Sequence, residues 1–233
     1  VEKHWNEKTQ AVLVASPANP TGTMVAEKDL KALAALTARR GAALIVDEIY
    51  HGLTYGSDAQ SVLDITDEAF VINSFSKYFG MTGWRIGWLV APRRYMDALD
   101  RLAQNMVLSV SSAAQYAALA AFGPQAHEIC EQRRKCFAAR RDFLLPALRE
   151  IGFSIPVTPK GAFYLYADCS KLSSDAFSCS RRILEEAGVA VTPGRDFGRF
   201  RADQHIRFAY TTSLEKLKEG VRRLERFFKN KGV

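Results

Sequence analysis

The segment Ser74-Phe75-Ser76-Lys77 carries a lysine in a setting that suggests covalent chemistry. The lysine follows an apolar run over residues 70–73, which predicts a buried strand, and two serine hydroxyls stand just before it. Arg85 adds a guanidinium eight residues after the lysine. Lysines act as nucleophiles through the neutral amine when burial or nearby cations suppress their charge. These residue types together would let an enzyme hold an aldehyde cofactor covalently and bind its phosphate group.

Three polar side chains come at the ends of predicted strands. Apolar runs predict strands over residues 11–15, 42–46, 70–73 and 86–90. A helix is expected between the first two, over residues 27–40, and this alternation is typical of an α/β domain. Asn19, Asp47 and Lys77 lie at or just past the ends of the first three strands. Because ligands bind at this edge of open α/β sheets, the pattern predicts a ligand site there.

The rest of the chain predicts first helices and then a mixture of strands and helices. Helices are expected over residues 97–106, 111–122 and 124–151, and later over 178–187 and 214–228. Strands are expected over residues 163–166 and 206–209. The pattern predicts a large α/β domain, a connecting helix, and a smaller α+β domain at the C-terminal end.

Composition excludes several classes of protein. The 233 residues suffice for one large domain or two ordinary ones, and no apolar run approaches the roughly 20 residues that a membrane helix needs. The four cysteines, Cys130, Cys136, Cys169 and Cys179, form no CxxC pair, and the four histidines are scattered, so no metal site is expected. The cysteines are typical of reduced residues in a cytoplasmic protein.

The net charge of +7 comes mainly from the later helices. Basic residues cluster at Arg133-Arg134-Lys135 and again from Arg222 onward, which raises the alternative of a nucleic-acid partner. Acidic residues such as Glu131 and Glu219 are interspersed, as on ordinary solvated helix faces. No nucleic-acid partner is therefore expected.

Five short motifs stand in an order that resembles the class I/II aminotransferases, which are fold type I enzymes dependent on pyridoxal 5'-phosphate. The motifs are Asn19-Pro20-Thr21-Gly22, Asp47-Glu48-Ile49-Tyr50, Ser74-Phe75-Ser76-Lys77, Arg85 within Gly83-Trp84-Arg85-Ile86-Gly87-Trp88, and Arg207 within Ile206-Arg207-Phe208-Ala209-Tyr210. The resemblance runs from about Val12 to the C-terminal end. It implies a three-layer α/β/α large domain, incomplete at its N-terminal side, over residues 1–125. It implies a connecting interdomain helix over 126–151 and a small α+β domain over 152–233.

The resemblance also implies roles for the motif residues. Lys77 would form a Schiff base with the cofactor and would later move a proton between the substrate Cα and the cofactor. Asp47 would pair with the pyridine nitrogen and keep it protonated. Alternatively, Asp47 would have only a structural role, as a cap for a helix that begins where the strand ends.

The remaining cofactor contacts fall on four residues in this resemblance. Tyr50 and Asn19 would hydrogen-bond the phenolic oxygen of the cofactor, although each could be an ordinary loop or turn residue. Ser74 and Arg85 would bind the phosphate. The apolar neighbours of Arg85 suggest that its side chain is at least partly buried.

Arg207 would bind the substrate α-carboxylate in this family, with Asn19 also on the substrate side. Arg207 stands inside an apolar strand, where an unpaired charge is costly, and a structural salt bridge is the alternative. Two other segments resemble family segments. Residues 161–164 are expected on the substrate side, and residues 192–194 in a loop near a dimer interface.

The implied activity is transfer of an amino group between an L-amino acid and a 2-oxo acid by a cytoplasmic homodimer. One alternative keeps the cofactor and changes the reaction to that of a fold type I lyase or decarboxylase. Acyl-CoA-condensing synthases fit less well, because they usually carry a histidine where Tyr50 stands. Another alternative is the aminotransferase-like sensor domain of a transcription regulator.

The resemblance lacks the family's N-terminal part, which normally exceeds a hundred residues before the Asn-Pro-Thr-Gly motif. The missing part supplies the rest of the phosphate site and the aromatic ring that stacks on the cofactor. The chain is therefore expected to be a fragment of a longer enzyme, with apolar surface exposed and possible loss of activity.

Overall fold

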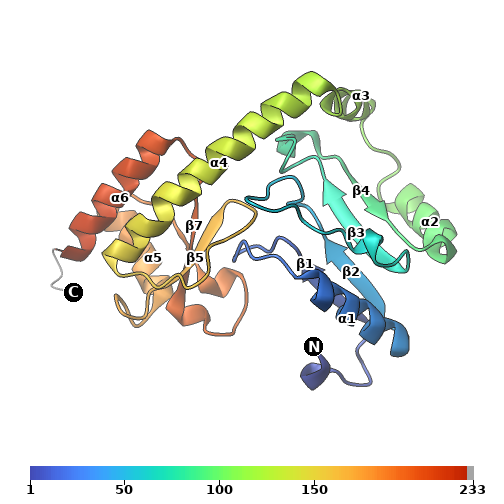
Figure 1. Cartoon of the computed structure of the whole chain (residues 1–233), viewed down its shortest axis with the longest axis horizontal. Coiled ribbons are helices and arrows are strands. Elements are labelled where there is room, and N and C mark those ends of the chain that lie inside the picture. Colours follow the sequence, from blue (N-terminus) through green and yellow to red (C-terminus); the bar gives the residue numbers. More distant parts are fainter. Residues whose placement is uncertain (230–233) are drawn as a thin grey trace. The chain divides into compact units, whose positions relative to one another are not determined.

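The computed structural model describes residues 1–229, and the chain forms two compact units (Figure 1). The first unit contains residues 1–18 and 24–132. The second contains residues 19–23 together with the chain from Arg133 onward. The short segment 19–23 thus groups with the later part of the chain, although it directly follows the first strand.

The first unit is built on a four-stranded sheet. Its strands are β1 (Ala11–Ala15), β2 (Ala43–Asp47), β3 (Ala69–Ser74) and β4 (Gly87–Val90), in the spatial order β1-β2-β3-β4. The first three are parallel, and β4 runs antiparallel to β3. The predicted α/β class is confirmed, and each of the four strands predicted for this unit is found with its ends shifted by at most one residue.

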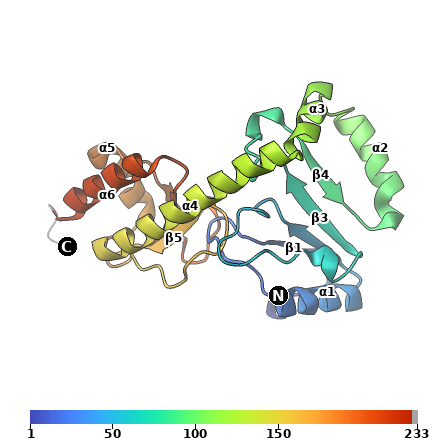
Figure 2. The same cartoon turned by 45° about the horizontal axis from the view of Figure 1, so that its top comes forward.

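Helix α1 (Glu27–Arg39) covers one face of this sheet (Figures 1 and 2). Leu33 and Ala34 of the helix pack against a buried cluster made by alternate residues of the strands, which includes Leu44, Val46 and Val71. Burial of each such aliphatic side chain contributes about 1.5–3 kcal/mol. The helix ends as its sequence predicts, because Gly41 adopts a left-handed conformation with φ of +63° just after it.

The opposite face of the same sheet is not covered within the first unit. Leu13 of β1 is 65% exposed and Ile72 of β3 is 40% exposed, and Leu89 of β4 is also exposed. Leu13 and Ile72 alternate with buried residues along β1 and β3, so the sequence period of two produces both faces there, whereas every residue of β4 is exposed. An apolar sheet face of this kind is uncommon in a stable monomer.

Three helices follow the sheet in sequence. They are α2 (Met96–Met106), α3 (Ser112–Ala121) and α4 (Pro124–Ile151), which continues from the first unit into the second. Ala118 and Ala121 of α3 pack against the buried ring of Phe75, two residues before Lys77. The small side chains let the helix approach the aromatic cluster closely, so α3 supports the start of the lysine loop.

The second unit contains an antiparallel sheet with the order β5-β7-β6, and two further helices. Its strands are β5 (Tyr164–Asp168), β6 (Thr192–Pro193) and β7 (His205–Ala209), and its helices are α5 (Ala176–Ala187) and α6 (Leu214–Lys229). Ile206 and Phe208 of β7 are buried, and Phe153 contacts both Phe208 and Phe228 of α6. Because side chains alternate along a strand, Arg207 lies on the face opposite this core.

The described part of the chain shows two further features. None of its helices is long and apolar enough to cross a membrane. Over residues 1–229, no group of three or more histidine, cysteine, aspartate or glutamate side chains is placed to hold a metal ion.

Candidate active site

The carboxyl ends of the parallel strands bring several polar residues of the first unit to one edge of the sheet. Asp47 is the last residue of β2 and Ser74 is the last residue of β3. The backbone of Asp47 pairs with Ile72 of β3, and its carbonyl accepts a hydrogen bond of 3.1 Å from the Ser16 amide beyond β1. The ends of the three strands are therefore locked in register, and the loops that leave them start side by side.

Asp47 and Tyr50 are held by the turn that follows β2. The Asp47 carboxylate accepts a hydrogen bond of 3.0 Å from the Ile49 amide, and this residue is half-buried. Tyr50 is only 4% exposed. The Lys77 ammonium nitrogen lies 6.0 Å from the centroid of the Tyr50 ring. The structure thus brings the predicted lysine next to the predicted tyrosine.

Lys77 stands in a tight loop after β3. Its carbonyl accepts a hydrogen bond of 3.1 Å from the Gly80 amide, and the Phe75 carbonyl accepts one of 2.9 Å from Met81. Within residues 1–229, no carboxylate forms an ion pair with the Lys77 ammonium group. The position of the amine is therefore set by the backbone of the loop, and no carboxylate among these residues compensates its charge.

Two serine hydroxyls meet just before the lysine. Ser74 Oγ and Ser76 Oγ are 2.9 Å apart, and Ser74 Oγ accepts a hydrogen bond of 3.0 Å from the Ser76 amide. The Ser76 carbonyl in turn accepts a bond of 2.8 Å from the Thr82 hydroxyl. The two hydroxyls form a compact group of hydrogen-bonding oxygens at the end of β3. Ser76 was part of the sequence motif without being predicted as a ligand.

Arg85 is exposed, so the prediction that its side chain is partly buried is wrong. The apolar neighbours did not bury it, because Trp84 is itself 48% exposed and the Trp88 ring packs instead on Phe75. The residue adopts a left-handed backbone conformation, with φ of +53°, between a 3₁₀ turn and β4. Its guanidinium donates a hydrogen bond of 2.9 Å to the Thr82 carbonyl. A non-glycine residue in this conformation is uncommon and costs about 1 kcal/mol or more.

Asn19 and Arg207 meet directly within the second unit. The Arg207 guanidinium donates a hydrogen bond of 2.8 Å to the Asn19 side-chain oxygen. Gly22 fixes the segment that carries Asn19, since its carbonyl accepts bonds from the amides of Lys160 and Gly161. A Cβ on Gly22 would stand 2.6 Å from Pro159 Cβ, so only glycine permits this close approach. Two residues separated by most of the sequence are thereby placed in contact.

Two aromatic rings and a hydroxyl surround the Arg207 guanidinium. Its central carbon lies 4.2 Å from the centroid of the Tyr164 ring and 4.6 Å from that of Phe197. Thr192 Oγ1 accepts a hydrogen bond of 3.3 Å from the same group. Aromatic rings attract a cation through their electron-rich faces and leave the in-plane N–H groups for hydrogen bonding. Sequence reasoning expected Tyr164 on the substrate side but did not find Phe197 or Thr192 as partners of Arg207.

Arg207 has no acidic partner among the described residues. No ion pair joins its guanidinium to a carboxylate anywhere in residues 1–229, and its buried Nε has no hydrogen-bond partner. The structural salt bridge considered as an alternative is therefore not found. Because a partly buried guanidinium without a compensating charge is costly, the arrangement favours an anionic ligand as the missing partner.

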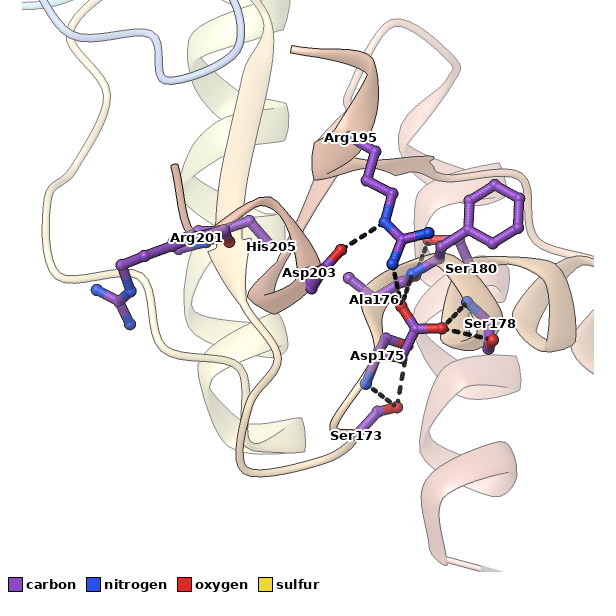
Figure 3. Close-up of polar contacts among 10 residues, drawn as sticks. Ser173, Asp175, Ala176, Ser178, Ser180, Arg195, Arg201, Asp203 and His205 are labelled. Carbon is purple, nitrogen blue, oxygen red and sulfur yellow. Dashed lines mark hydrogen bonds and ion pairs between the residues drawn. The ribbon is translucent and has the colours of Figure 1, made fainter. Parts of the chain in front are cut away.

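The loop that carries Phe197 is joined to the start of helix α5 by an ion pair (Figure 3). Arg195 pairs with Asp203, and its guanidinium also lies 3.8 Å from the Asp175 carboxylate. Asp175 caps α5 by accepting hydrogen bonds from the amides of Phe177 and Ser178, at 3.1 and 3.2 Å. The Asp175 carboxylate thus contacts both the first turn of α5 and Arg195 of the loop, which limits the movement of Phe197.

These observations first define a class of protein. The first unit is an α/β fold that presents an unpaired amine, a carboxylate and two hydroxyls at the carboxyl edge of its sheet. The second is an α+β unit that presents an arginine with no ion-pair partner in the described residues. Sheet-edge sites of this kind bind small molecules in α/β enzymes.

Comparison with known proteins then identifies the family. The model of the aminotransferase class I and II family matches residues 1–224, and the chain belongs to this family. It is 38% identical over 217 residues to the valine–pyruvate aminotransferase of Mycobacterium tuberculosis and 38% identical over 233 residues to an aspartate aminotransferase of Geobacillus stearothermophilus. These matches cover 92% and 94% of the chain but 56% and 58% of the two relatives.

Solved structures agree with this assignment. An aminotransferase from Mycobacterium tuberculosis superposes with a TM-score of 0.93 at 36% identity, and covers 98% of the chain and 59% of its own length. An aromatic aminotransferase from Pyrococcus horikoshii gives a TM-score of 0.93 at 32% identity, covering 99% and 63%. The predicted fold type is therefore confirmed, and the chain spans little more than half the length of these relatives. Class I and II aminotransferases use pyridoxal 5'-phosphate.

Proposed function

We propose that the chain is the cofactor- and substrate-binding part of an aminotransferase that transfers an amino group between an L-amino acid and a 2-oxo acid. The observation that carries the proposal is the place of Lys77 beside Tyr50, at the sheet edge where Asp47 ends β2, with no acidic partner for its amine within residues 1–229. A lyase, a decarboxylase or the sensor domain of a transcription regulator would share parts of this arrangement, but the named relatives favour transamination.

The donor set of the first unit fits pyridoxal 5'-phosphate. When bound, this cofactor supplies an aldehyde that takes up the substrate amine and a ring that accepts electrons from the substrate. Lys77 offers an amine for the aldehyde, and Asp47 offers a carboxylate for the ring nitrogen. Ser74 and Arg85 offer a hydroxyl and a guanidinium for the phosphate. The hydroxyl pair at Ser74 and Ser76 supports the phosphate assignment, because its two oxygens are already 2.9 Å apart.

Lys77 and Asp47 carry the proton chemistry in this proposal. Lys77 Nζ would hold the cofactor covalently. The same Nζ would serve as the base that takes the proton from the substrate Cα and as the acid that gives it back. Asp47 would keep a proton on the ring nitrogen, which would make removal of the Cα proton easier. The Ile49 amide orients the Asp47 carboxylate by its hydrogen bond.

The other predicted residues bind and orient. Tyr50 and Asn19 would donate hydrogen bonds to the phenolic oxygen of the cofactor, and Asn19 also accepts a hydrogen bond from Arg207. Arg207 binds the α-carboxylate of the amino acid through in-plane N–H groups. Its missing acidic partner supports this role, because a bound carboxylate would supply the compensating charge.

The family membership supports the domain assignment. We propose that residues 1–125 are the C-terminal part of the large cofactor-binding domain, that 126–151 form the interdomain helix, and that 152–233 form the small domain. The whole protein is proposed to be a cytoplasmic homodimer that binds neither nucleic acid nor membrane. Sedimentation of the full-length protein at a subunit mass or twice that mass tests the dimer.

Covalent capture of the cofactor tests the central assignment. The purified chain is mixed with pyridoxal 5'-phosphate, reduced with borohydride, digested and mapped by mass spectrometry. Lys77 is expected to carry most of the label, and Lys77→Ala is expected to abolish it together with the visible absorbance of the bound cofactor.

The matched control is Lys171→Ala, which removes an exposed lysine of the second unit and is expected to leave the label on Lys77 unchanged. Equal labelling of many surface lysines, with none preferred, would contradict the assignment of Lys77. Turnover of amino acid and oxo acid pairs then tests transamination itself, first in the full-length protein and then in the 233-residue chain.

A further inference from the structure

We propose that Tyr78 is a positioning residue for Lys77, which fastens the lysine loop both to the turn that carries Tyr50 and to helix α4. The proposal rests on the function assigned to Lys77. It concerns a residue that neither the motif pattern nor the comparisons single out. Its basis is a set of contacts that all lie within the first unit.

The first set of contacts joins Tyr78 to α4. Its hydroxyl donates a hydrogen bond of 2.9 Å to Glu131 Oε1 and lies 3.3 Å from His127 Nδ1. His127 and Glu131 are four residues apart on the helix, so both face the same side. A hydrogen bond to a carboxylate is stronger than one between neutral groups. The helix therefore holds the far end of the Tyr78 side chain at a defined place.

The second contact joins the Tyr78 ring to the turn after β2. A Cβ on Gly52 would stand 2.5 Å from the ring carbon Cδ2 and 2.6 Å from Cγ, so one side of the ring lies close against a backbone that has no side chain. Gly52 has φ of +85°, a conformation that suits glycine. Because Gly52 follows Tyr50 by two residues, the ring couples the lysine loop to the loop of the predicted cofactor-binding tyrosine.

The residues on both sides of Lys77 are then immobilised. On the N-terminal side, Ser76 is held through its amide by Ser74 and through its carbonyl by Thr82. On the C-terminal side, Tyr78 is held by Glu131 and by the Gly52 backbone. Lys77 has four rotatable side-chain bonds and no ion-pair partner in the part of the chain that the structure describes. Its backbone is therefore the chief determinant of where its amine can reach.

Hydrogen exchange of the cofactor-free chain provides the first test. The amides of Gly80 and Met81 bond to the Lys77 and Phe75 carbonyls, so they report directly on the lysine loop. Tyr78→Phe, which removes only the hydroxyl, is expected to speed their exchange about 5- to 10-fold. Glu131→Gln keeps an acceptor oxygen and is expected to have a smaller effect. Gly52→Ala adds a methyl group that would displace the Tyr78 ring directly. It is expected to speed the exchange of the same two amides.

Covalent capture of pyridoxal 5'-phosphate at Lys77 provides the second test. A change that only lowered stability would leave the capture rate of the folded chain unchanged. In Tyr78→Phe, displacement of the Lys77 amine is expected to slow capture of the cofactor about 5- to 10-fold. The matched control is Tyr116→Phe, which removes a hydroxyl from a tyrosine of α3 that is 75% exposed. That variant is expected to match the wild type in both measurements.

The outcomes separate this proposal from the proposed function. Exchange within twofold of wild type in Tyr78→Phe would overturn the fastening of the loop. Faster exchange with an unchanged capture rate would overturn the positioning role. Failure of the wild-type chain itself to capture the cofactor at Lys77 would overturn the function assigned to this lysine, while the exchange rates would still decide whether Tyr78 holds the loop.

Discussion

At the scale of single residues, Arg207 is a cation with aromatic partners and, in the described part of the chain, no acidic one. Tyr164 and Phe197 lie against its guanidinium, and Asn19 and Thr192 accept hydrogen bonds from it. Rings stabilise the cation without supplying a negative charge, so they orient it while its charge stays available. This combination suits a group that must bind and release a carboxylate repeatedly.

Loss of the Phe197 ring is therefore expected to weaken carboxylate binding. Phe197→Leu keeps apolar bulk and removes the ring face, so the dissociation constant for pyruvate is expected to rise about 2- to 30-fold. Titration calorimetry or NMR line broadening measures it. Phe200→Leu is the matched control, since Phe200 is 89% exposed in the same loop. Equal affinities for the Phe197 variant and the wild type would contradict the orienting role.

The cysteines differ sharply in their surroundings. Burial, with smaller effects from Cys179 and Asp168, raises the pKa of the Cys169 thiol to about 12. Cys136 is exposed. Because the thiolate is the reactive form, iodoacetamide at pH 8 is expected to alkylate Cys136 and leave Cys169 intact until the chain unfolds. Mass spectrometry of the alkylated peptides checks this, and rapid alkylation of Cys169 in the folded chain would contradict it.

The raised pKa of Cys169 predicts how the stability of the chain changes with pH. In the unfolded chain Cys169 ionises near an ordinary cysteine pKa of about 8.5, whereas the folded chain keeps it protonated up to about pH 12. Unfolding therefore releases a proton between these values. The contribution of Cys169 to stability is complete below about pH 8.5 and is lost as the pH rises toward 12.

At the scale of secondary structure, the proposed site residues are placed by the ends of elements and by the loops between them. Asp47 and Ser74 end parallel strands, and Lys77 follows in a loop that α3 supports through Phe75. Asp175 begins α5 and also contacts Arg195 of the Phe197 loop. Such junctions couple the stability of a helix to the position of a binding residue.

Removal of the α5 cap tests this coupling. Asp175→Ala is expected to lower the free energy of unfolding by about 1 kcal/mol, because two amides of the first turn lose their acceptor. The Ser178 hydroxyl, followed by the Ser178 and Phe177 amides and Arg195, holds the pKa of Asp175 below its ordinary value. Its contribution is therefore present above about pH 4 and lost as the pH falls through the lowered pKa.

Urea denaturation at neutral and acid pH measures both effects. The wild type is expected to lose more stability than Asp175→Ala between pH 6 and the lowest pH at which both fold. Equal losses in the two proteins would show that the carboxylate contributes no charge-dependent stability. Asp142→Ala is a suitable control, because this aspartate is exposed within α4 and caps no helix.

At the scale of the whole molecule, the first unit has an apolar sheet face that its own helices do not cover. The chain also spans 56–59% of the length of the first aminotransferases that it matches. Uncovered apolar sheet surface promotes association between molecules. The uncovered apolar face of this sheet is therefore expected to promote self-association of the chain in solution.

Substitution of that face is expected to improve solubility without cost to folding. The double change Leu13→Thr and Ile72→Thr is expected to reduce binding of a hydrophobic dye and self-association, with stability unchanged within about 0.5 kcal/mol. Light scattering and dye fluorescence measure these properties. Val71→Thr on the covered face is the matched control and is expected to destabilise the chain by about 1 kcal/mol or more. Unchanged dye binding in the double variant would contradict the assignment of the open face.

The sequence by itself determined the α/β class, the strand positions, and the motifs with Asn19, Asp47, Lys77 and Arg207. It could do so because strand periodicity and turn chemistry are local, and because short motifs fix residue types at set intervals. The strands β1 to β4 were accordingly found within one residue of their predicted ends. The exposure of Arg85 was predicted wrongly, since flanking aromatic residues do not by themselves decide which way a side chain turns.

Only the tertiary structure decided which distant residues meet. The contact of Arg207 with Asn19 spans nearly the whole chain, and the rings of Phe197 and Tyr164 reach Arg207 from a loop and a neighbouring strand. The fastening of Tyr78 by Glu131 and Gly52 likewise joins three separate segments. Contacts of this kind arise from packing and register between elements, and no local pattern of residue types encodes them.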